Sequence, residues 1–163
     1  MTVRDAPRDG GPVELRCSGL VVRASQLLVV GRNCRGDWVL PGGSPEPGEG
    51  SAACVRREVR EETGVHVETG EVAFVFEVTD PGRQDRLVEI VFFAREQGEQ
   101  ATLHSTEAGL TPRWVPLDEL GRVKLRPPIA GYLRGATRRA PGRSAPYLGN
   151  LWRPEASPGE ADD

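Results

Sequence analysis

Residues 42–65 read GGSPEPGEGSAACVRREVREETGV. From Ser51 to Thr63 the residues favour or tolerate a helix, and Gly64 supplies the stop. On a helical wheel this segment has an apolar stripe suited to burial against a sheet, a sector of arginines and a sector of glutamates. A glycine-rich turn that ends at Gly43 is followed by residues 44–48, Ser-Pro-Glu-Pro-Gly, which cannot form regular structure. These residues therefore predict a loop followed by an amphipathic helix.

The glutamate sector concentrates negative charge where the helix opposes it. Glu58, Glu61 and Glu62 lie at i, i+3 and i+4, on one face near the negative end of the helix dipole. Arg57 and Glu61 form the one in-register i, i+4 pair, in the less favourable order. A solvated acidic face is the plain alternative. A divalent cation would turn the repulsion into attraction, because Mg²⁺ takes hard oxygen ligands, so the pattern favours a metal site.

Apolar segments on both sides of this helix predict β-strands. In chain order they are 13–22, 26–32, 38–40, 65–78, 87–95 and 114–117. Asp80-Pro81-Gly82 predicts a turn, Asp118 the cap of a helical turn, and residues 128–139 a second helix. Strands interleaved with helices in this way predict an α/β fold, in which a mixed sheet lies between helices.

The composition of the 163-residue chain predicts one folded domain with polar ends. We assign residues 1–12 to a flexible N-terminus, residues 13–139 to the domain and residues 140–163 to a C-terminal tail. The tail contains an apolar cluster at 147–152. Such a cluster predicts docking, either on its own domain or on a second subunit.

The charge and cysteine content exclude several classes of protein. A formal charge of −3 without a basic tract argues against a stable nucleic-acid complex, although not against a nucleotide pocket. Cys17, Cys34 and Cys54 are odd in number and lack metal-ligand spacing, which predicts reduced thiols. No segment reads as a membrane-spanning helix or as the apolar core of a signal peptide, so we expect a cytoplasmic protein.

The fixed positions of residues 43–65 resemble the signature of Nudix hydrolases. That signature is G, five of any residue, E, seven of any residue, and R-E-U-x-E-E-x-G-U with U aliphatic. Gly43, Glu49 and Arg57–Val65 match every position. The resemblance covers roughly residues 13–134 and implies an α/β/α sandwich with a mixed β-sheet, in which this box is a loop–helix–loop. It also implies hydrolysis of a diphosphate linkage with Mg²⁺, or with Mn²⁺ in its place.

Position by position, the resemblance implies roles for individual residues. The implied metal ligands are Gly43 through its carbonyl oxygen, Glu58, Glu61 and Glu62. Arg57 would orient a glutamate through an ion pair, and Glu49 would support the loop or an outer-shell water. The base that takes a proton from the attacking water would be a box glutamate such as Glu61, or Glu107 on a later loop, with Glu99 as the rival of Glu107.

The sequence signals for residues that contact the substrate are less specific than those for the metal ligands. Arg32 is placed like family arginines that contact substrate phosphate, and Trp38 either stacks on a base or packs beside the Pro-Gly-Gly loop. Pro81 stands sixteen residues after Val65, as in members that hydrolyse ADP-ribose, but it also belongs to a plain turn. Glu89 either faces the substrate cleft or lies on the wet side of an edge strand.

We therefore predict a Mg²⁺-dependent hydrolase acting on ADP-ribose, a nucleotide sugar or a (d)NTP. One alternative is a nucleotide-sensing module that binds without turnover, which the complete set of box glutamates disfavours. Another is a pyrophosphohydrolase of RNA 5′ ends, which the weak charge disfavours. Homodimers are common in the family that the chain resembles, and we predict one.

Overall fold

The computed structural model describes residues 11–82, 85–140 and 142–154. Its elements in chain order are β1 (Val13–Arg23), β2 (Gln26–Arg32), β3 (Asp37–Val39), β4 (Gly42–Gly43), α1 (Ser51–Thr63), β5 (Val67–Thr79), β6 (Arg86–Glu96), β7 (Leu110–Pro116), the 3₁₀ turn η1 (Leu120–Arg122), α2 (Ala130–Ala136) and β8 (Tyr147–Asn150). The predicted helix over residues 51–63 is confirmed. Gly64 ends it in the left-handed conformation, with φ of 77°, which glycine adopts without strain.

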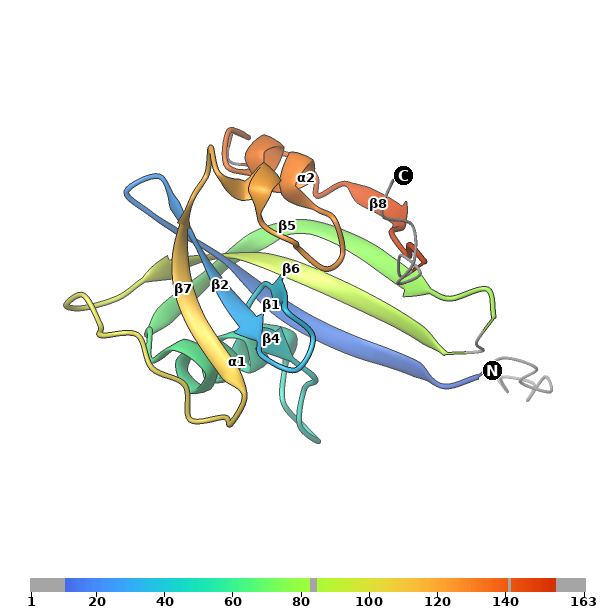
Figure 1. Ribbon diagram of the computed structural model, residues 1–163, viewed down its shortest axis with the longest axis horizontal. Coiled ribbons are helices and arrows are strands. Elements are labelled where there is room, and N and C mark those ends of the chain that lie inside the picture. The colour runs from blue at the N-terminus through green and yellow to red at the C-terminus, as the bar shows by residue number, and fades with distance from the viewer. Residues whose placement is uncertain (1–10, 83–84, 141, 155–163) are drawn as a thin grey trace, which may run out of the picture.

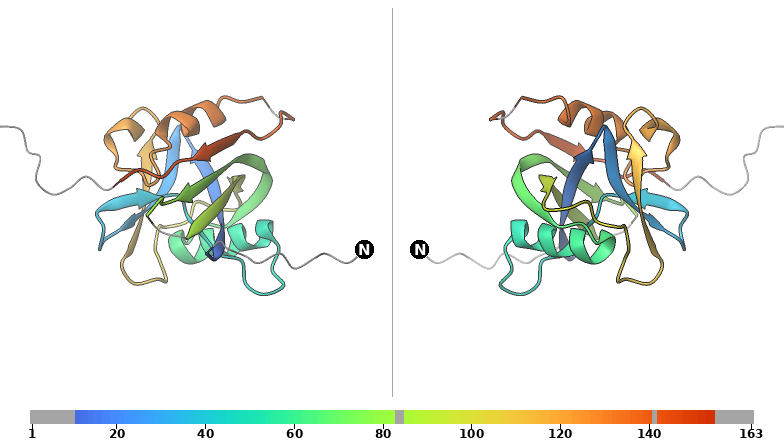
Figure 2. Two further views of the ribbon diagram at one scale, coloured as in Figure 1. Left: turned by 90° about the vertical axis from the view of Figure 1, so that its right-hand side faces the viewer. Right: turned by 90° about the vertical axis from the view of Figure 1, so that its left-hand side faces the viewer.

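The strands form a mixed sheet in the order β3-β2-β1-β6-β5-β8, with β4 paired to β1 and β7 paired to β2. The β1–β6 and β5–β8 pairs are parallel, whereas the other pairs are antiparallel. Figure 1 and Figure 2 show α1 on one side of the strands and α2 on the other. This arrangement confirms the predicted α/β fold with a mixed sheet between helices.

Two apolar clusters fill the spaces between the sheet and the helices. On one side α1 packs Val55 and Val59 against β1. Gly19 of β1 permits this close packing, because a Cβ there would lie 3.0 Å from a methyl group of Val59. On the other side Leu133 of α2 belongs to the cluster that contains Phe76 of β5. The sheet therefore has a core on each face and holds α1 against its β1 strand.

Strand β7 is longer than the predicted segment 114–117. It begins at Leu110 because it pairs with β2 over its full length, from Leu110 opposite Arg32 to Pro116 opposite Gln26. Pairing with β2 thus extends the strand over residues 110–113, which the local sequence does not mark as a strand. The predicted end of the strand agrees to within one residue.

The two helical predictions near the C-terminus were only partly right. The turn predicted after Asp118 is η1, which starts at Leu120 and has no side-chain cap. Helix α2 has seven residues and is shorter than the predicted range 128–139. Two of those seven are Gly131 and Gly135, which lower helix propensity.

The apolar cluster at 147–152 packs onto the chain's own sheet. Residues 147–150 form β8, which lies parallel to β5 at the sheet edge. The backbone N–H of Leu151 donates to the carbonyl oxygen of Glu77 at 2.8 Å, and the Leu151 side chain is buried. Part of the segment assigned to a tail from residue 140 therefore belongs to the sheet. Within the described ranges, no helix is long and apolar enough to cross a membrane.

Candidate active site

Strand β4 brings the backbone of two glycines against both β1 and α1. Gly42 pairs with Ser18, and Gly43 pairs with Cys17. A Cβ at Gly42 would collide with the backbone of β1, and a Cβ at Gly43 would collide with the carboxylate of Glu58. Only glycine fits this close approach. The carbonyl oxygen of Gly43 accepts a hydrogen bond from the thiol of Cys54 at 3.4 Å.

Three carboxylates meet beside this strand. One oxygen from each of Glu58, Glu61 and Glu107 lies within 4.8 Å of the other two. Glu58 is buried, Glu61 is half-buried and Glu107 is exposed. The structure thus brings Glu107, which lies far along the chain, to the two box glutamates. Its rival in the sequence, Glu99, is exposed in the same loop and lies outside this group.

The loop that carries Glu107 is attached to the C-terminal end of α1. The N–H of Thr106 donates to the carbonyl oxygen of Glu61 at 2.8 Å, and its hydroxyl donates to the same oxygen at 3.0 Å. The N–H of His104 donates to the carbonyl oxygen of Thr63 at 3.1 Å. The last carbonyls of a helix lack partners within the helix. These bonds supply partners and place Glu107 next to Glu61.

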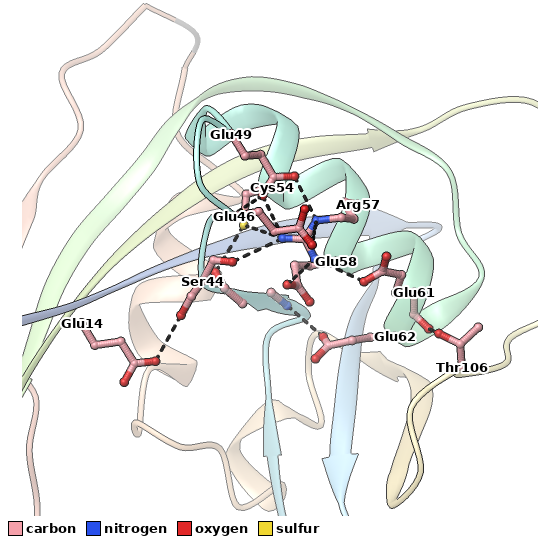
Figure 3. A network of polar contacts seen from close by, with 12 residues as sticks. Glu14, Ser44, Glu46, Glu49, Cys54, Arg57, Glu58, Glu61, Glu62 and Thr106 are labelled. Carbon is pink, nitrogen blue, oxygen red and sulfur yellow. Dashed lines mark hydrogen bonds and ion pairs between the residues drawn. The ribbon is translucent and has the colours of Figure 1, made fainter.

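Arg57 is the cation at the centre of this site (Figure 3). Its guanidinium donates to Glu58 at 2.7 Å and to Glu61 at 3.2 Å. It also makes a two-bond contact with Glu49, at 2.9 and 2.8 Å. These bonds lower the pKa of Glu49 to about 2. Arg57 therefore does more than the single i, i+4 pair that the helical wheel predicts.

Glu62 is not a member of the group of three, although Glu58 and Glu107 are near enough for their charges to act on it. Its carboxylate accepts a hydrogen bond from the backbone N–H of Gly42 at 2.9 Å, as Figure 3 shows. Burial raises the pKa of Glu62 to about 7, although the charge of Arg16 opposes this shift. The sequence treats the glutamates at 58, 61 and 62 as equivalent ligands. The structure joins Glu58 and Glu61 with Glu107 and bonds Glu62 to β4, and the role of Glu62 as a metal ligand stays a prediction.

The two residues predicted to contact substrate, Arg32 and Trp38, instead contact other residues of the chain. Arg32 makes a two-bond ion pair with Asp37, at 2.7 and 2.6 Å. The ring of Trp38 lies over Gly31, where a Cβ would be 3.0 Å from it, and the guanidinium of Arg113 lies 5.2 Å from its centre. Trp38 thus packs on the sheet beside the loop, which is one of its two predicted roles.

A second polar group lies inside the sheet, and the sequence did not predict it. Glu89 accepts a short hydrogen bond from the hydroxyl of Ser18 and lies 3.6 Å from the guanidinium of Arg16. Arg16 also donates to the carbonyl oxygen of Leu40 at 3.1 Å. Burial raises the pKa of Glu89. One of the two predicted positions of Glu89, the solvent-exposed side of an edge strand, is therefore wrong. Strand β6 is not at the edge, because it lies between β1 and β5.

One signal in the sequence could have indicated this group. Glu89 is a charge with apolar residues on both sides of it in its strand, and a charge in such a place usually has a partner, which here is Arg16. Only the parallel pairing of β1 with β6 puts the two residues opposite each other.

The donor set beside α1 suits a hard divalent cation. Glu58, Glu61 and Glu107 offer carboxylate oxygens, the ligands that Mg²⁺ and Mn²⁺ prefer. The arginine that contacts two of them is shared with Glu49. This leaves an excess of negative charge in a small volume, and a bound cation would relieve it.

Comparison with known proteins identifies relatives of this chain. The model of the NUDIX domain family matches residues 15–136. The human 8-oxo-dGDP phosphatase NUDT18 is 39% identical over 88 residues, which are 50% of this chain and 26% of NUDT18. A MutT-like protein of Streptomyces ambofaciens is 37% identical over 106 residues, 63% of this chain and 64% of that protein. The chain thus matches about a quarter of NUDT18 and less than two thirds of the MutT-like protein.

A solved structure supports the fold. An ADP-ribose pyrophosphatase from Streptococcus suis superposes with a TM-score of 0.66 at 22% identity, covering 82% of this chain and 98% of that one. Identity at this level shows a shared fold and leaves the substrate open.

Proposed function

This chain belongs to the NUDIX domain family, and on that premise we propose that it hydrolyses a diphosphate linkage in a nucleoside diphosphate derivative with Mg²⁺. The observation that carries the proposal is the group formed by Glu58, Glu61 and Glu107, whose oxygens lie within 4.8 Å of one another. One arginine, Arg57, contacts two of the three and is shared with a further carboxylate. Such a group suits a cation and a substrate that brings phosphate oxygens.

Each residue of the site would have a distinct role in the reaction. Glu58 and Glu61 would hold Mg²⁺, which when bound neutralises phosphate oxygens and lowers the pKa of a water molecule. Arg57 keeps both carboxylates in place through its hydrogen bonds. Glu107 is the exposed member of the group and would accept the proton of the attacking water, with Glu61 as the alternative base. Glu62 would support β4 through Gly42.

The proposed substrate is a small nucleotide. The relatives support this class, since NUDT18 is named for the diphosphate of an oxidised deoxyguanosine nucleoside. Their identity extends over half of this chain or somewhat more. We therefore add 8-oxo-dGDP and 8-oxo-dGTP to the predicted candidates ADP-ribose, nucleotide sugars and (d)NTPs.

The test is a panel of these substrates and a 5′-triphosphorylated RNA, each incubated with Mg²⁺, with Mn²⁺ and with chelator, and analysed by chromatography of the products. We expect metal-dependent cleavage of one class, with a loss of about 10²-fold or more in Glu61→Gln, because this change removes a metal-binding oxygen's charge. Tyr132→Phe is a matched control, because Tyr132 is an exposed residue on α2.

The outcomes are distinct. Cleavage that persists in chelator, or that Glu61→Gln retains in full, would contradict the metal-based proposal. Nucleotide binding without cleavage of any panel member would support the sensing module. Cleavage confined to triphosphorylated RNA ends would support the RNA alternative.

A further inference from the structure

A pocket of about 500 Å³ opens beside the C-terminal segment. Val78 of β5, Leu87 of β6 and Trp152 supply apolar surface to its lining. Its charged lining consists of three carboxylates and two guanidiniums, which belong to Glu14, Asp80, Asp85, Arg35 and Arg86. The pocket therefore combines an aromatic side chain and an apolar surface with hydrogen-bond donors and acceptors, which are the groups that bind a flat heterocycle with a polar edge.

This pocket adjoins the loop that leads to the acidic group. Glu14 accepts a hydrogen bond from the hydroxyl of Ser44 at 3.2 Å, and the carbonyl oxygen of Ser44 accepts one from Arg57 at 3.3 Å. Figure 3 shows this line of contacts from Glu14 to α1. The lining of the pocket is thus linked to the acidic group through these two hydrogen bonds.

The structure holds Trp152 in a defined position. The side chain of Asn150 donates to the carbonyl oxygen of Thr79 at 3.0 Å and accepts from the Thr79 N–H at 3.1 Å. The N–H of Trp152 donates to the same Asn150 oxygen at 3.0 Å. Leu151 between them is buried in the core on the α2 side of the sheet. Trp152 itself stays half-buried at the pocket. A buried anchor and a bonded backbone thus present the indole to the pocket.

We propose that Trp152, held in place by the segment that forms β8, completes the substrate site and is a specificity-determining residue on which the nucleobase stacks. The inference rests on the proposed function, since it places the base of the same substrate whose phosphates lie at the acidic group. Indole stacks on any base, and the apolar side chains of Val78 and Leu87 favour the flat face of a ring over water. Arg35 supplies a donor for the phosphate or the base edge.

The test measures binding of product-like ligands that cannot be hydrolysed further. Calorimetry with Mg²⁺ would compare AMP, GMP and 8-oxo-dGMP with ribose 5-phosphate, which lacks a base. Trp152→Ala is expected to weaken binding of the nucleotides roughly 10-fold and to leave ribose 5-phosphate unchanged, because stacking is lost. Trp152→Phe should restore most of the affinity. Tyr147→Ala is the matched control, an aromatic residue on the same segment that is 62% exposed.

Three results would overturn the inference. One is unchanged nucleotide binding by Trp152→Ala. Another is an equal loss in Trp152→Ala and Tyr147→Ala, which would mean that the segment acts only through the fold. The third is a wild type that binds ribose 5-phosphate as tightly as the nucleotides. A chain ending at Leu151 keeps β8 and provides a second variant.

The same variants separate this inference from the proposed function. If the wild type hydrolyses nothing in the substrate panel while Trp152→Ala alone loses nucleotide binding, the proposed function fails and the pocket remains. If hydrolysis is metal-dependent and nucleotide binding is indifferent to Trp152, the hydrolase stands and this inference fails.

Discussion

Carboxylates at two places close to β4 differ in how their negative charge is balanced. Inside the sheet, the single carboxylate of Glu89 contacts Arg16 and the hydroxyl of Ser18, and the charge of Arg16 also acts on Glu62. Beside α1, Glu58 and Glu61 share Arg57 with Glu49. Glu107 adds another negative charge to the second group.

The difference indicates what each group is for. A buried carboxylate with its own cation and hydrogen-bond donor is satisfied by the protein and needs no ligand. Carboxylates that outnumber their cations keep a repulsive energy that an incoming divalent ion removes. We therefore interpret Glu89 as structural and the group of three as the place where chemistry occurs. The predictions below test that distinction.

The largest expected effect is on catalysis in Glu58→Gln. This change removes a metal-binding charge, so we expect kcat with Mg²⁺ to fall by about 10²-fold or more. In chelator the same variant should melt at the same temperature as the wild type or higher, because repulsion within the group decreases. Steady-state kinetics and thermal melting with and without metal would measure both effects. A variant that loses stability in chelator, with kcat unchanged, would contradict the distinction.

Arg57→Lys is expected to lower kcat about 10- to 100-fold, the range for residues that orient metal ligands. Lysine keeps the charge but cannot reproduce the planar, multi-bond contact with Glu49 and Glu58. The measurement is kcat as a function of Mg²⁺ concentration. Arg56→Lys is the control, since Arg56 bonds Thr69 at the surface. Equal effects in the two variants would show that Arg57 has no special positioning role.

Arg16→Met should act on stability far more than on chemistry. It leaves Glu89 buried without its cation, a change that costs about 3 kcal/mol, somewhat reduced if Glu89 takes up a proton. Urea unfolding would measure the loss, and adding Glu89→Gln should recover part of it. We expect kcat of the folded variant to stay within a few-fold of the wild type. A loss of kcat as large as that of Glu58→Gln would erase the difference between the two groups.

Glu62→Gln is expected to change how stability depends on pH, and its effect at a single pH is at most about as large as that of Arg16→Met. Burial raises the pKa of Glu62 from 4.5 to about 7. Between pH 4.5 and pH 7, therefore, Glu62 keeps its proton in the folded protein but has released it in the unfolded chain. In chelator, this group makes the wild type lose stability as pH rises from 4.5 to 7, by at most about 3 kcal/mol.

In Glu62→Gln that loss should be absent, while the amide oxygen still accepts from Gly42. Unfolding free energies at pH 5 and pH 8 would show the wild type and the variant diverging. If the unfolding free energies of the wild type and the variant change equally between pH 5 and pH 8, the pKa of Glu62 is not raised by burial.

Much of the fold could be predicted because its signals are local. The periodicity of residues 51–63 and the left-handed stop at Gly64 specify α1 within the chain itself. The apolar runs at 13–22 and 26–32 likewise predict β1 and β2, which pair as antiparallel neighbours. The length of β7 could not be predicted, since it depends on pairing with β2. The same applies to β8, a short strand that exists only beside β5.

The sequence by itself determined the chemistry that is available, because the spacing of Glu58 and Glu61 on one helix face follows from 3.6 residues per turn. Only the tertiary structure decided which partners complete it. Thr106 brings Glu107 to the end of α1, the backbone N–H of Gly42 in β4 bonds Glu62, and the sheet edge holds Trp152 at a pocket. Such contacts depend on how strands pair and helices pack, and no local pattern in the chain encodes them.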